Sequence, residues 1–332
     1  MTTKRVLLGN EAIARGLLEG GCQVMASYPG TPATEILPAL VRFREEEGAQ
    51  IYIEWSTNEK VAFEVALAAA YAGKRAAVAM KQVGLNVASD PLFSSLYTGV
   101  KGGFLIIAAD DPGPHSSQTE QDSRLWGPMA KVPVLDPSSP QEAKEMVPYA
   151  FALSERYEIP VLLRPTLRIC HARQTITFGP VKGPKRKARF EKDPRRWAAT
   201  PRWRYRLHQE LNRKLEAIRR EYVNAPFNGA FIGGRPFDPS RGPFPLGVIA
   251  AGSCFGTMKE LLEELELEVP LFKVATPFPF PFELLLDFLR SCDQILILEE
   301  PDAALELLIP EKGRVRGDST GPFHQRGNSP QR

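Results

Sequence analysis

Cysteine is scarce in this chain of 332 residues, and no two cysteines are spaced as metal ligands usually are. Four are scattered along it: Cys22, Cys170, Cys254 and Cys292. This scatter argues for a reducing compartment and against a zinc or iron–sulfur site formed by this chain alone. Apolar runs of about 18 residues, the length of a membrane helix, are also missing, and the first residues have no signal-peptide core. We therefore expect a cytoplasmic protein with no membrane partner.

The common catalytic signatures are absent as well. The chain has no GxSxG elbow, no phosphate-binding P-loop and no GxGxxG dinucleotide fingerprint. Asp111, His115 and Glu120 supply a single imidazole at spacings that match no standard ligand set, so no metal ligands are expected in this chain. The turn Gly252–Gly256 resembles a phosphate loop only weakly, and tight packing between a strand and a helix explains it better.

Charge is unevenly distributed along the chain, although its net charge is only +3. The segment from Val181 to Tyr222 has 15 lysines and arginines against five acidic residues. With its tryptophans and tyrosines, such a block could hold nucleic acid, or it could be a solvated connector that ends in an amphipathic helix. Residues 207–222 favour the connector, because their apolar side chains recur at helical spacing: Leu211, Leu215, Ile218 and Tyr222.

Elsewhere, short apolar strands alternate with segments of helical periodicity, which is the pattern of a parallel sheet covered on both faces. Expected strands lie near residues 5–9, 23–27, 51–55, 75–80, 104–109, 132–135 and 160–163, and the same alternation resumes at residue 246. The sequence thus predicts two α/β domains, at residues 1–180 and 243–310. Between them lies the connector, 181–242, and after them a tail, 311–332, which has too little apolar surface to order itself.

Ligands of such sheets collect beyond the carboxyl ends of the strands, where loops and helix N-termini meet. Four segments are expected there: Tyr28–Pro32, Trp55–Glu59, Met80–Asn86 and Asp110–Arg124. The last is a long polar loop with few apolar anchors, a type that usually binds something.

Two residues in these segments have both a structural and a functional interpretation. Thr31 could be the N-cap of a helix or could face a ligand. Glu59 begins a helix that is apolar on nearly every side and should be almost completely buried. Its carboxylate could serve in proton exchange, or it could return to the main chain of Ser56 in a capping box.

The ordered motifs of the chain resemble those of a known family. They are Gly9–Gly16, Tyr28–Pro32, Asn58–Ala62, Val83–Pro91 and Asp110–Arg124, followed by Phe190–Arg196 and Leu298–Glu300. Together they resemble the alpha subunits of the indolepyruvate ferredoxin oxidoreductases, which are thiamine diphosphate-dependent 2-oxoacid:ferredoxin oxidoreductases. The resemblance covers nearly the whole chain and argues against a nucleic-acid partner.

The resemblance implies a fold and a set of site residues. Residues up to about 180 would form the doubly wound domain that holds the aminopyrimidine half of thiamine diphosphate, and residues after about 243 a domain like the C-terminal domain of transketolase. The matching catalytic residue is Glu59, which would hydrogen-bond the aminopyrimidine and so promote loss of the thiazolium proton. Further residues are expected around the cofactor, Gly30 and Asn86, and around the substrate, Thr31, Asp111, His115 and Gln118.

The chain also departs from the family pattern. Family alpha subunits add a diphosphate-binding domain with its Mg²⁺ site and a cysteine-rich ferredoxin-like domain with 4Fe–4S clusters, and this sequence has neither. We expect separate chains to supply these domains and a gamma-type domain, in a dimer of heteromers that uses coenzyme A and reduces ferredoxin. A non-catalytic interaction subunit and an enzyme for another 2-oxoacid are the alternatives. Gln82 stands where many relatives have histidine.

Overall fold

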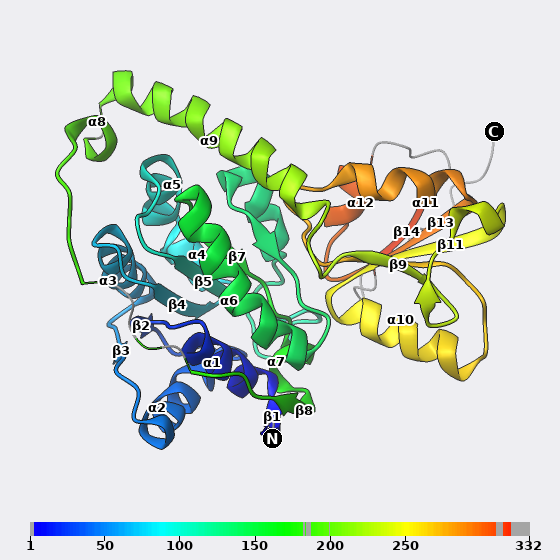
Figure 1. The fold of residues 1–332 in the computed structure, drawn as a ribbon, viewed down its shortest axis with the longest axis horizontal. Coiled ribbons are helices and arrows are strands. Elements are labelled where there is room, and N and C mark those ends of the chain that lie inside the picture. Colours follow the sequence, from blue (N-terminus) through cyan, green and yellow to red (C-terminus); the bar gives the residue numbers. More distant parts are fainter. Residues whose placement is uncertain (1–2, 182, 184–186, 199, 310–314, 320–332) are drawn as a thin grey trace.

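The computed structural model describes residues 3–181, 183, 187–198, 200–309 and 315–319. They form two α/β units that are joined by a long helix (Figure 1). Within these residues, no helix combines the length and the apolar composition needed to cross a membrane.

The first unit contains a six-stranded parallel sheet in the order β3-β2-β4-β5-β7-β6. Its strands are β2 (Val24–Ser27), β3 (Tyr52–Trp55), β4 (Ala76–Lys81), β5 (Phe104–Ala109), β6 (Val134–Leu135) and β7 (Val161–Leu163). All six residues of β5 are buried, as expected for a central strand that is covered on both faces. The predicted parallel sheet is confirmed.

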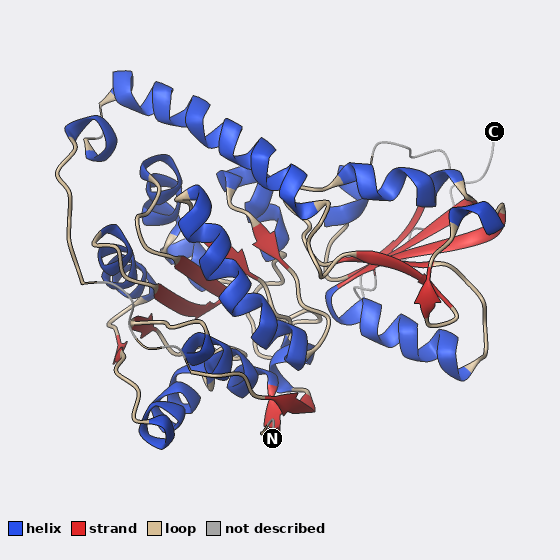
Figure 2. Cartoon of the chain, viewed as in Figure 1, coloured by secondary structure: helices blue, strands red, loops and turns tan. Residues whose placement is uncertain are grey.

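Helices cover both faces of this sheet (Figure 2). The main ones are α1 (Gly9–Glu19), α2 (Ile36–Glu47), α3 (Glu59–Tyr71), α4 (Gly84–Val87), α5 (Ser89–Thr98) and α6 (Pro140–Tyr157). Helix α1 packs against α2 and α6, whereas α3 packs against α5. Because crossovers between parallel strands are right-handed, these two sets lie on opposite faces.

The first predicted strand does not join this sheet. Strand β1 (Lys4–Leu8) pairs antiparallel with β8 (Arg173–Thr177), which follows the short helix α7 (Leu167–His171). The first three residues of β1 are exposed, so the strand has no continuous apolar face to bury in a central position. It forms a separate two-stranded ribbon instead.

The connector contains α8 (Pro194–Trp197) and α9 (Pro201–Tyr222). The buried side chains of α9 are the four that its periodicity predicted. The helix begins six residues before the expected start at 207, because Pro201 at its first position already has a helical φ.

The second unit contains a mixed sheet in the order β10-β9-β12-β11-β13-β14. The strands are β9 (Gly229–Ile232), β10 (Arg235–Pro236), β11 (Phe244–Ala251), β12 (Leu271–Val274), β13 (Cys292–Glu299) and β14 (Val315–Ser319), and the helices are α10 (Gly252–Glu264), α11 (Leu286–Arg290) and α12 (Ala304–Leu308). Strands β9 and β10 thus lie inside the expected connector. The tail was expected not to order itself. This expectation is wrong for β14, which pairs in parallel with β13 through main-chain hydrogen bonds. The other residues of the tail, 311–314 and 320–332, lie outside the described residues.

The two units are joined by main-chain and ionic contacts. Val134 N–H donates to Phe278 O at 2.7 Å, and Asp136 N–H donates to Ala275 O at 2.9 Å. Arg164 lies beside them, 1% exposed, with its guanidinium 2.6 Å from Asp110 and 3.4 Å from Asp136. It also donates to the main-chain oxygen of Glu300 in the second unit, at 2.8 Å. The charged side chains of this contact are therefore buried, and hydrogen bonds from Arg164 cross it.

A glycine makes this contact possible. Gly252, the first residue of α10, has a φ of +52°, and a Cβ there would lie 2.9 Å from Asp136 Oδ1. The turn Gly252–Gly256 therefore serves close packing, as expected from the sequence, with the first unit as its neighbour.

Candidate functional site

The sheet of the first unit changes winding direction beside β2. The chain passes from β2 outward to β3 and then returns to β4 on the other side of β2. The connections after β2 and β4 diverge at this point. The usual ligand site of such sheets is a crevice beyond the carboxyl ends of the strands at this switch point, and we refer to this edge of the sheet as the crevice. Two of the predicted segments, Tyr28–Pro32 and Met80–Asn86, border it.

Loops from distant parts of the sequence meet over this crevice. A Cβ at Gly30 would lie 3.0 Å from Lys81 Cβ, so a larger residue there would crowd the end of β4. Lys81 Nζ donates to Ser116 O at 2.7 Å, and Ser116 Oγ lies 3.5 Å from Thr31 O. Gly30 and Thr31 are therefore brought together with the loop of residues 110–124.

The capping interpretation of Thr31 is wrong. Helix α2 begins at Ile36 with Glu35 as its N-cap, and Thr31 stands in a preceding turn, exposed to solvent. The side chain remains free to face a ligand.

The capping-box interpretation of Glu59 is wrong as well. Asn58 is the N-cap of α3, with its Oδ1 accepting from Val61 N–H at 2.9 Å. The N–H of Ser56, which a capping box would need, donates to Ser27 O at 2.9 Å. Within the described chain, the half-buried Glu59 carboxylate has no hydrogen-bond or ion-pair partner.

Gly84, the first residue of α4, provides the space for this side chain. A Cβ at Gly84 would lie 2.7 Å from Glu59 Cγ and 3.0 Å from Glu59 Oε1. The expected cofactor residue Asn86 follows on the same short helix and is exposed. Glu59 and α4 thus form one side of the site.

Helix α3 is less buried than its composition suggested. Val61, Glu64 and Ala68 form an exposed face, whereas Ala62, Phe63 and Ala66 are buried. Four large apolar side chains, after β2, at the end of β3 and on α3 and α4, are exposed too: Tyr28, Trp55, Val61 and Val87 at 37%, 42%, 37% and 47%. We call these four residues the apolar collar. Apolar surface around a polar site is typical of an interface.

The loop of residues 110–124 is held from within by Asp111, which is 1% exposed. Its carboxylate accepts from Ser116 N–H at 2.8 Å and from Ser117 Oγ at 2.6 Å. Burial opposes ionisation of Asp111, but the hydrogen bonds from Ser117 and Ser116 outweigh it, so the pKa is lowered. Gln82 Nε2 donates to Ser117 Oγ at 3.0 Å, and Gln82 Oε1 and Asp111 Oδ1 remain as buried acceptors with no donor in the described residues. Lys81 and Ser117 were not singled out in the sequence, and Gln82 was noted only as a departure from the family pattern, since only the folded loop brings these residues to Asp111.

The other two predicted substrate residues, His115 and Gln118, are exposed on this loop. Across the described residues, no three histidine, cysteine, aspartate or glutamate side chains converge as metal ligands.

The four thiols are free, and burial raises the pKa of Cys254 to about 12, so this thiol is not an activated nucleophile.

Comparisons with known proteins agree with this geometry. Residues 15–225 match the family model "Pyruvate flavodoxin/ferredoxin oxidoreductase, thiamine diP-bdg". Relatives named indolepyruvate oxidoreductase subunit IorA are 47% identical over 307 residues in Thermococcus kodakarensis and 41% identical over 315 residues in Archaeoglobus fulgidus. These alignments cover 91% and 93% of the chain but only 46% and 49% of the relatives, so the chain spans about half their length.

Two solved structures share the fold. A 2-oxoglutarate:ferredoxin oxidoreductase from Magnetococcus marinus matches 95% of the chain and 62% of its own, with a TM-score of 0.75 at 18% identity. A split-gene transketolase matches 94% of the chain and 88% of its own, with a TM-score of 0.57 at 17% identity. They confirm the predicted thiamine diphosphate-type sheet with a transketolase-like second domain. The chain belongs to the pyruvate flavodoxin/ferredoxin oxidoreductase family and carries its thiamine diphosphate-binding domain.

Proposed function

We propose that this chain is the pyrimidine-binding part of a 2-oxoacid:ferredoxin oxidoreductase that converts arylpyruvates, such as indolepyruvate, into acyl-CoA. The observation that carries the proposal is the Glu59 carboxylate. It is half-buried at the crevice of a thiamine diphosphate-binding domain and has no partner in the described residues. A buried polar group of a folded chain normally finds a partner, so an unpaired carboxylate here is suited to an external donor.

The residues present fit the aminopyrimidine half of thiamine diphosphate. Glu59 can accept a hydrogen bond from a protonated ring nitrogen, and Gly84 leaves the space that this side chain needs. Gly30 and Asn86 would line the same half of the cofactor. The cofactor supplies the nucleophilic carbon and the electron sink for decarboxylation. Glu59 would hold and return the proton on which that reactivity depends.

Substrate contacts would come from the two loops that meet over the crevice. Thr31 and the exposed loop residues His115 and Gln118 can reach a bound 2-oxoacid directly. Asp111 would act through the loop, because its carboxylate is occupied by Ser116 and Ser117. Coenzyme A would then take the acyl group.

Separate chains would complete the enzyme. The apolar collar places exposed aromatic and aliphatic surface beside Glu59, where a diphosphate-binding domain with its Mg²⁺ could cover it. The four free cysteines are too scattered for 4Fe–4S clusters, so a ferredoxin-like chain would carry these and a gamma-type domain would complete a dimer of heteromers. Electrons would leave to ferredoxin.

A reconstitution experiment tests the proposal. The full chain is mixed with candidate partner chains, and thiamine-dependent reduction of ferredoxin or a viologen dye is measured with indolepyruvate and a panel of other 2-oxoacids. Glu59→Gln should lower the rate about 100-fold or more, because the amide cannot exchange the proton. Glu64→Gln, on the exposed face of the same helix, is the matched control and should leave the rate unchanged.

Two outcomes would redirect the proposal. Equal rates for the Glu59 variant and its control would show a non-catalytic interaction subunit. Activity that depends on Glu59 but prefers a branched-chain or another 2-oxoacid would keep the chemistry and replace the substrate.

A further inference from the structure

The loop of residues 110–124 is closed at its base by contacts between its two ends. Asp110, which follows β5, accepts a hydrogen bond from the Ser123 N–H at 2.9 Å and another from the Ser123 hydroxyl. Next to Ser123, Asp122 Oδ1 accepts from the N–H and the Nε of Arg124, at 3.0 and 2.9 Å. We call these four residues the loop base. They are 0–5% exposed, whereas residues 114–116 in the middle of the loop are exposed.

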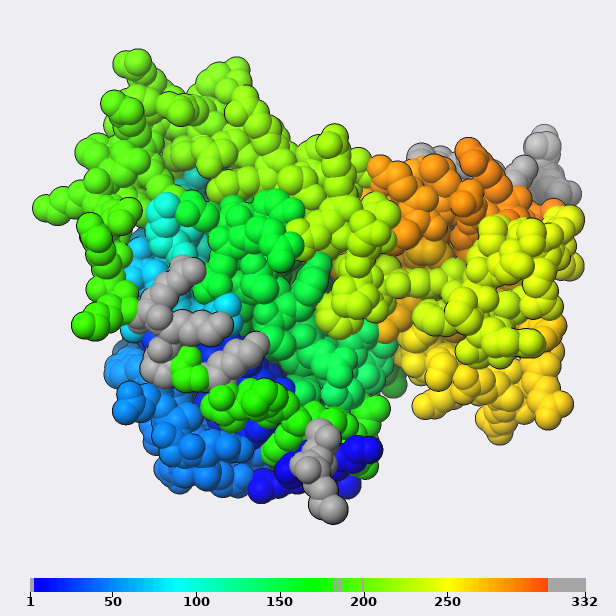
Figure 3. Space-filling model, in the orientation of Figure 1, coloured from blue at the N-terminus to red at the C-terminus, as the bar shows by residue number. Residues whose placement is uncertain are grey.

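The two units lie directly against each other (Figure 3), and the loop base takes part in their contact. Arg124 donates to two main-chain oxygens of the second unit, Glu300 O at 2.9 Å and Asp302 O at 3.0 Å. It also forms an ion pair with Glu299 at 3.0 Å. In the opposite direction, Asp302 N–H donates to Asp122 Oδ2 at 3.4 Å. This end of the loop is therefore held from outside its own unit.

The other end of the loop reaches the same main-chain oxygen. Arg164 donates to Asp110 Oδ2 at 2.6 Å and to Glu300 O at 2.8 Å. Glu300 O thus accepts from both Arg164 and Arg124 and links the two ends of the loop. Hydrogen bonds from charged donors are roughly twice as strong as those between neutral groups, so these two arginines fix the loop base firmly.

The segment that supplies these acceptors is itself fixed within the second unit. It connects β13 to α12. The Glu299 carboxylate accepts from the N–H groups of Leu305 and Glu306 in α12, at 2.7 and 3.0 Å. The hydroxyl of Ser253, in the first turn of α10, donates to the Glu300 carboxylate. Because this segment is tied to two helices of its unit, it forms a fixed support for the loop base.

We propose that the second unit positions the substrate loop, and that Arg124 is the positioning residue. Arg124 is 2% exposed, so it can act on a bound 2-oxoacid only through the loop. Without it, the loop base would separate from the segment between β13 and α12, and His115 and Gln118 would lose their fixed places over the crevice. Small displacements of the groups that orient a substrate are costly. The anchoring is a property of the fold, and its effect on the substrate rests on the proposed function.

Hydrogen–deuterium exchange of the full chain tests the anchoring. Arg124→Met should speed exchange of the amides of residues 111–123 about tenfold or more, because the loop opens without its support. Arg124→Lys keeps the charge but replaces the planar guanidinium fork by one ammonium, so exchange should rise by a smaller factor. Protection of β5 and α6 in both variants should stay as in the natural chain. The lysine variant carries the test where the methionine variant does not fold.

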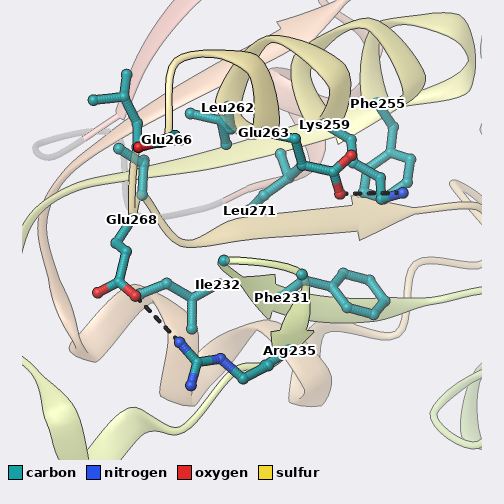
Figure 4. Close-up of a pocket in the computed structure, with 14 residues that line it drawn as sticks. Phe231, Ile232, Arg235, Phe255, Lys259, Leu262, Glu263, Glu266, Glu268 and Leu271 are labelled. Carbon is teal, nitrogen blue, oxygen red and sulfur yellow. Dashed lines mark hydrogen bonds and ion pairs between the residues drawn. The ribbon is translucent and has the colours of Figure 1, made fainter.

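Two matched controls separate the anchoring from a general loss of contacts. Arg168→Met removes another arginine that bonds Glu300, at 3.2 Å, from outside the loop. Arg235→Met removes an ion pair with Glu268 at a hollow of about 410 Å³ in the second unit (Figure 4). Arg235 is on β10, which β9, β12 and β11 separate from β13 in the sheet. Neither control should change exchange in residues 111–123.

Steady-state kinetics of the reconstituted enzyme test the effect on the substrate. Arg124→Lys should raise the KM for the 2-oxoacid about tenfold and change kcat less than about threefold, because the loop orients the substrate without touching the reacting atoms. Both controls should leave the two constants unchanged. A residue that only stabilised the fold would lower the amount of active enzyme, and with it kcat, but would not raise KM.

The outcomes distinguish this proposal from the proposed function. Unchanged loop exchange in both Arg124 variants would overturn the anchoring, and so would an equal increase in Arg168→Met. Faster loop exchange with an unchanged KM would overturn the effect on the substrate. Absence of activity with every partner chain would instead count against the proposed function, and the exchange rates would then decide the anchoring on their own.

Discussion

Carboxylates occupy two very different places in this molecule. At the crevice, Glu59 is half-buried, has no partner in the described residues and is surrounded by the apolar collar. Between the two units, Asp110, Asp136 and Glu299 are 0–2% exposed and lie against Arg164 or Arg124. The second arrangement uses its hydrogen-bonding capacity inside the chain. The first leaves that capacity unused within the described residues.

The pKa values of the carboxylates between the units reflect the free-energy cost of burying a charged carboxylate. Burial raises the pKa of Asp136 to about 6, although Arg164 and Arg124 lower it in part. Burial also raises the pKa of Asp110, whereas at Asp122 the attraction of Arg124 and Arg164 outweighs burial and lowers the pKa. Such a network specifies how the units dock rather than adding much net stability.

Removing the Arg164 guanidinium from the inter-unit network should have the largest effect on the free energy of unfolding. Arg164→Met would leave Asp110 and Asp136 buried without their cation and Glu300 O without its donor. We expect a loss of about 3–5 kcal/mol in the free energy of unfolding, measured by urea denaturation. Arg168→Met is the matched control, because Arg168 is 63% exposed and should cost at most about 1 kcal/mol. Equal losses of unfolding free energy for the two variants would mean that Arg164 is accessible to solvent in the folded protein.

Asp136→Asn should change how stability depends on pH. The pKa of about 6 in the folded chain lies above the ordinary value of 3.8, so the folded state keeps a proton that the unfolded state loses. Stability therefore falls as pH rises from about 4 to 6, by up to roughly 3 kcal/mol. The variant lacks this titration, so its stability relative to the natural chain should rise over that window in urea titrations. A difference that is constant with pH would contradict the burial of an ionisable Asp136.

The two regions also differ in how far the sequence predicts them. The loop of residues 110–124 could be found because its polar residues follow directly after a buried apolar strand. Glu59 stood in one of the polar segments expected beyond a strand, but its catalytic role was expected only from the family resemblance. The partners within that loop, and the exposure of one face of α3, depend on tertiary packing that periodicity does not report. Strand β9 lies inside a segment read as connector, because four residues beside two glycines carry little strand signal. The inter-unit network joins Arg164 to Glu300, 136 residues later, and no local pattern links them.

Gly84→Ala should affect the crevice more than the fold. The added Cβ would lie 2.7 Å from Glu59 Cγ and would displace the carboxylate. The proposed catalytic role of Glu59 tolerates little displacement, so on that proposal the reconstituted activity should fall about tenfold or more. Alanine favours the helix relative to glycine by up to about 1 kcal/mol, which offsets part of the crowding. Gly183→Ala, where a Cβ meets nothing within 4 Å, is the control, and a similar activity for both variants would disconnect α4 from the site.

Ser117→Ala should have the smallest effect, since it touches the crevice only through its loop. The change removes the 2.6 Å hydrogen bond to Asp111 and leaves Gln82 Nε2 without its nearest acceptor, at a cost of about 1–2 kcal/mol in unfolding free energy. Hydrogen bonding by Ser117 helps to lower the pKa of Asp111 in the folded chain, so its contribution is present at neutral pH and is lost as pH falls through that lowered pKa. The difference between variant and natural chain should therefore shrink on acidification. Ser116→Ala is the matched control, because it keeps the hydrogen bond from the Ser116 N–H to Asp111. It removes only the long contact of 3.4 Å between Ser116 Oγ and the Asp111 carboxylate, so the loss of unfolding free energy should be less than about 0.5 kcal/mol. Equal costs for both serines would show that Asp111 holds the loop through the main chain alone.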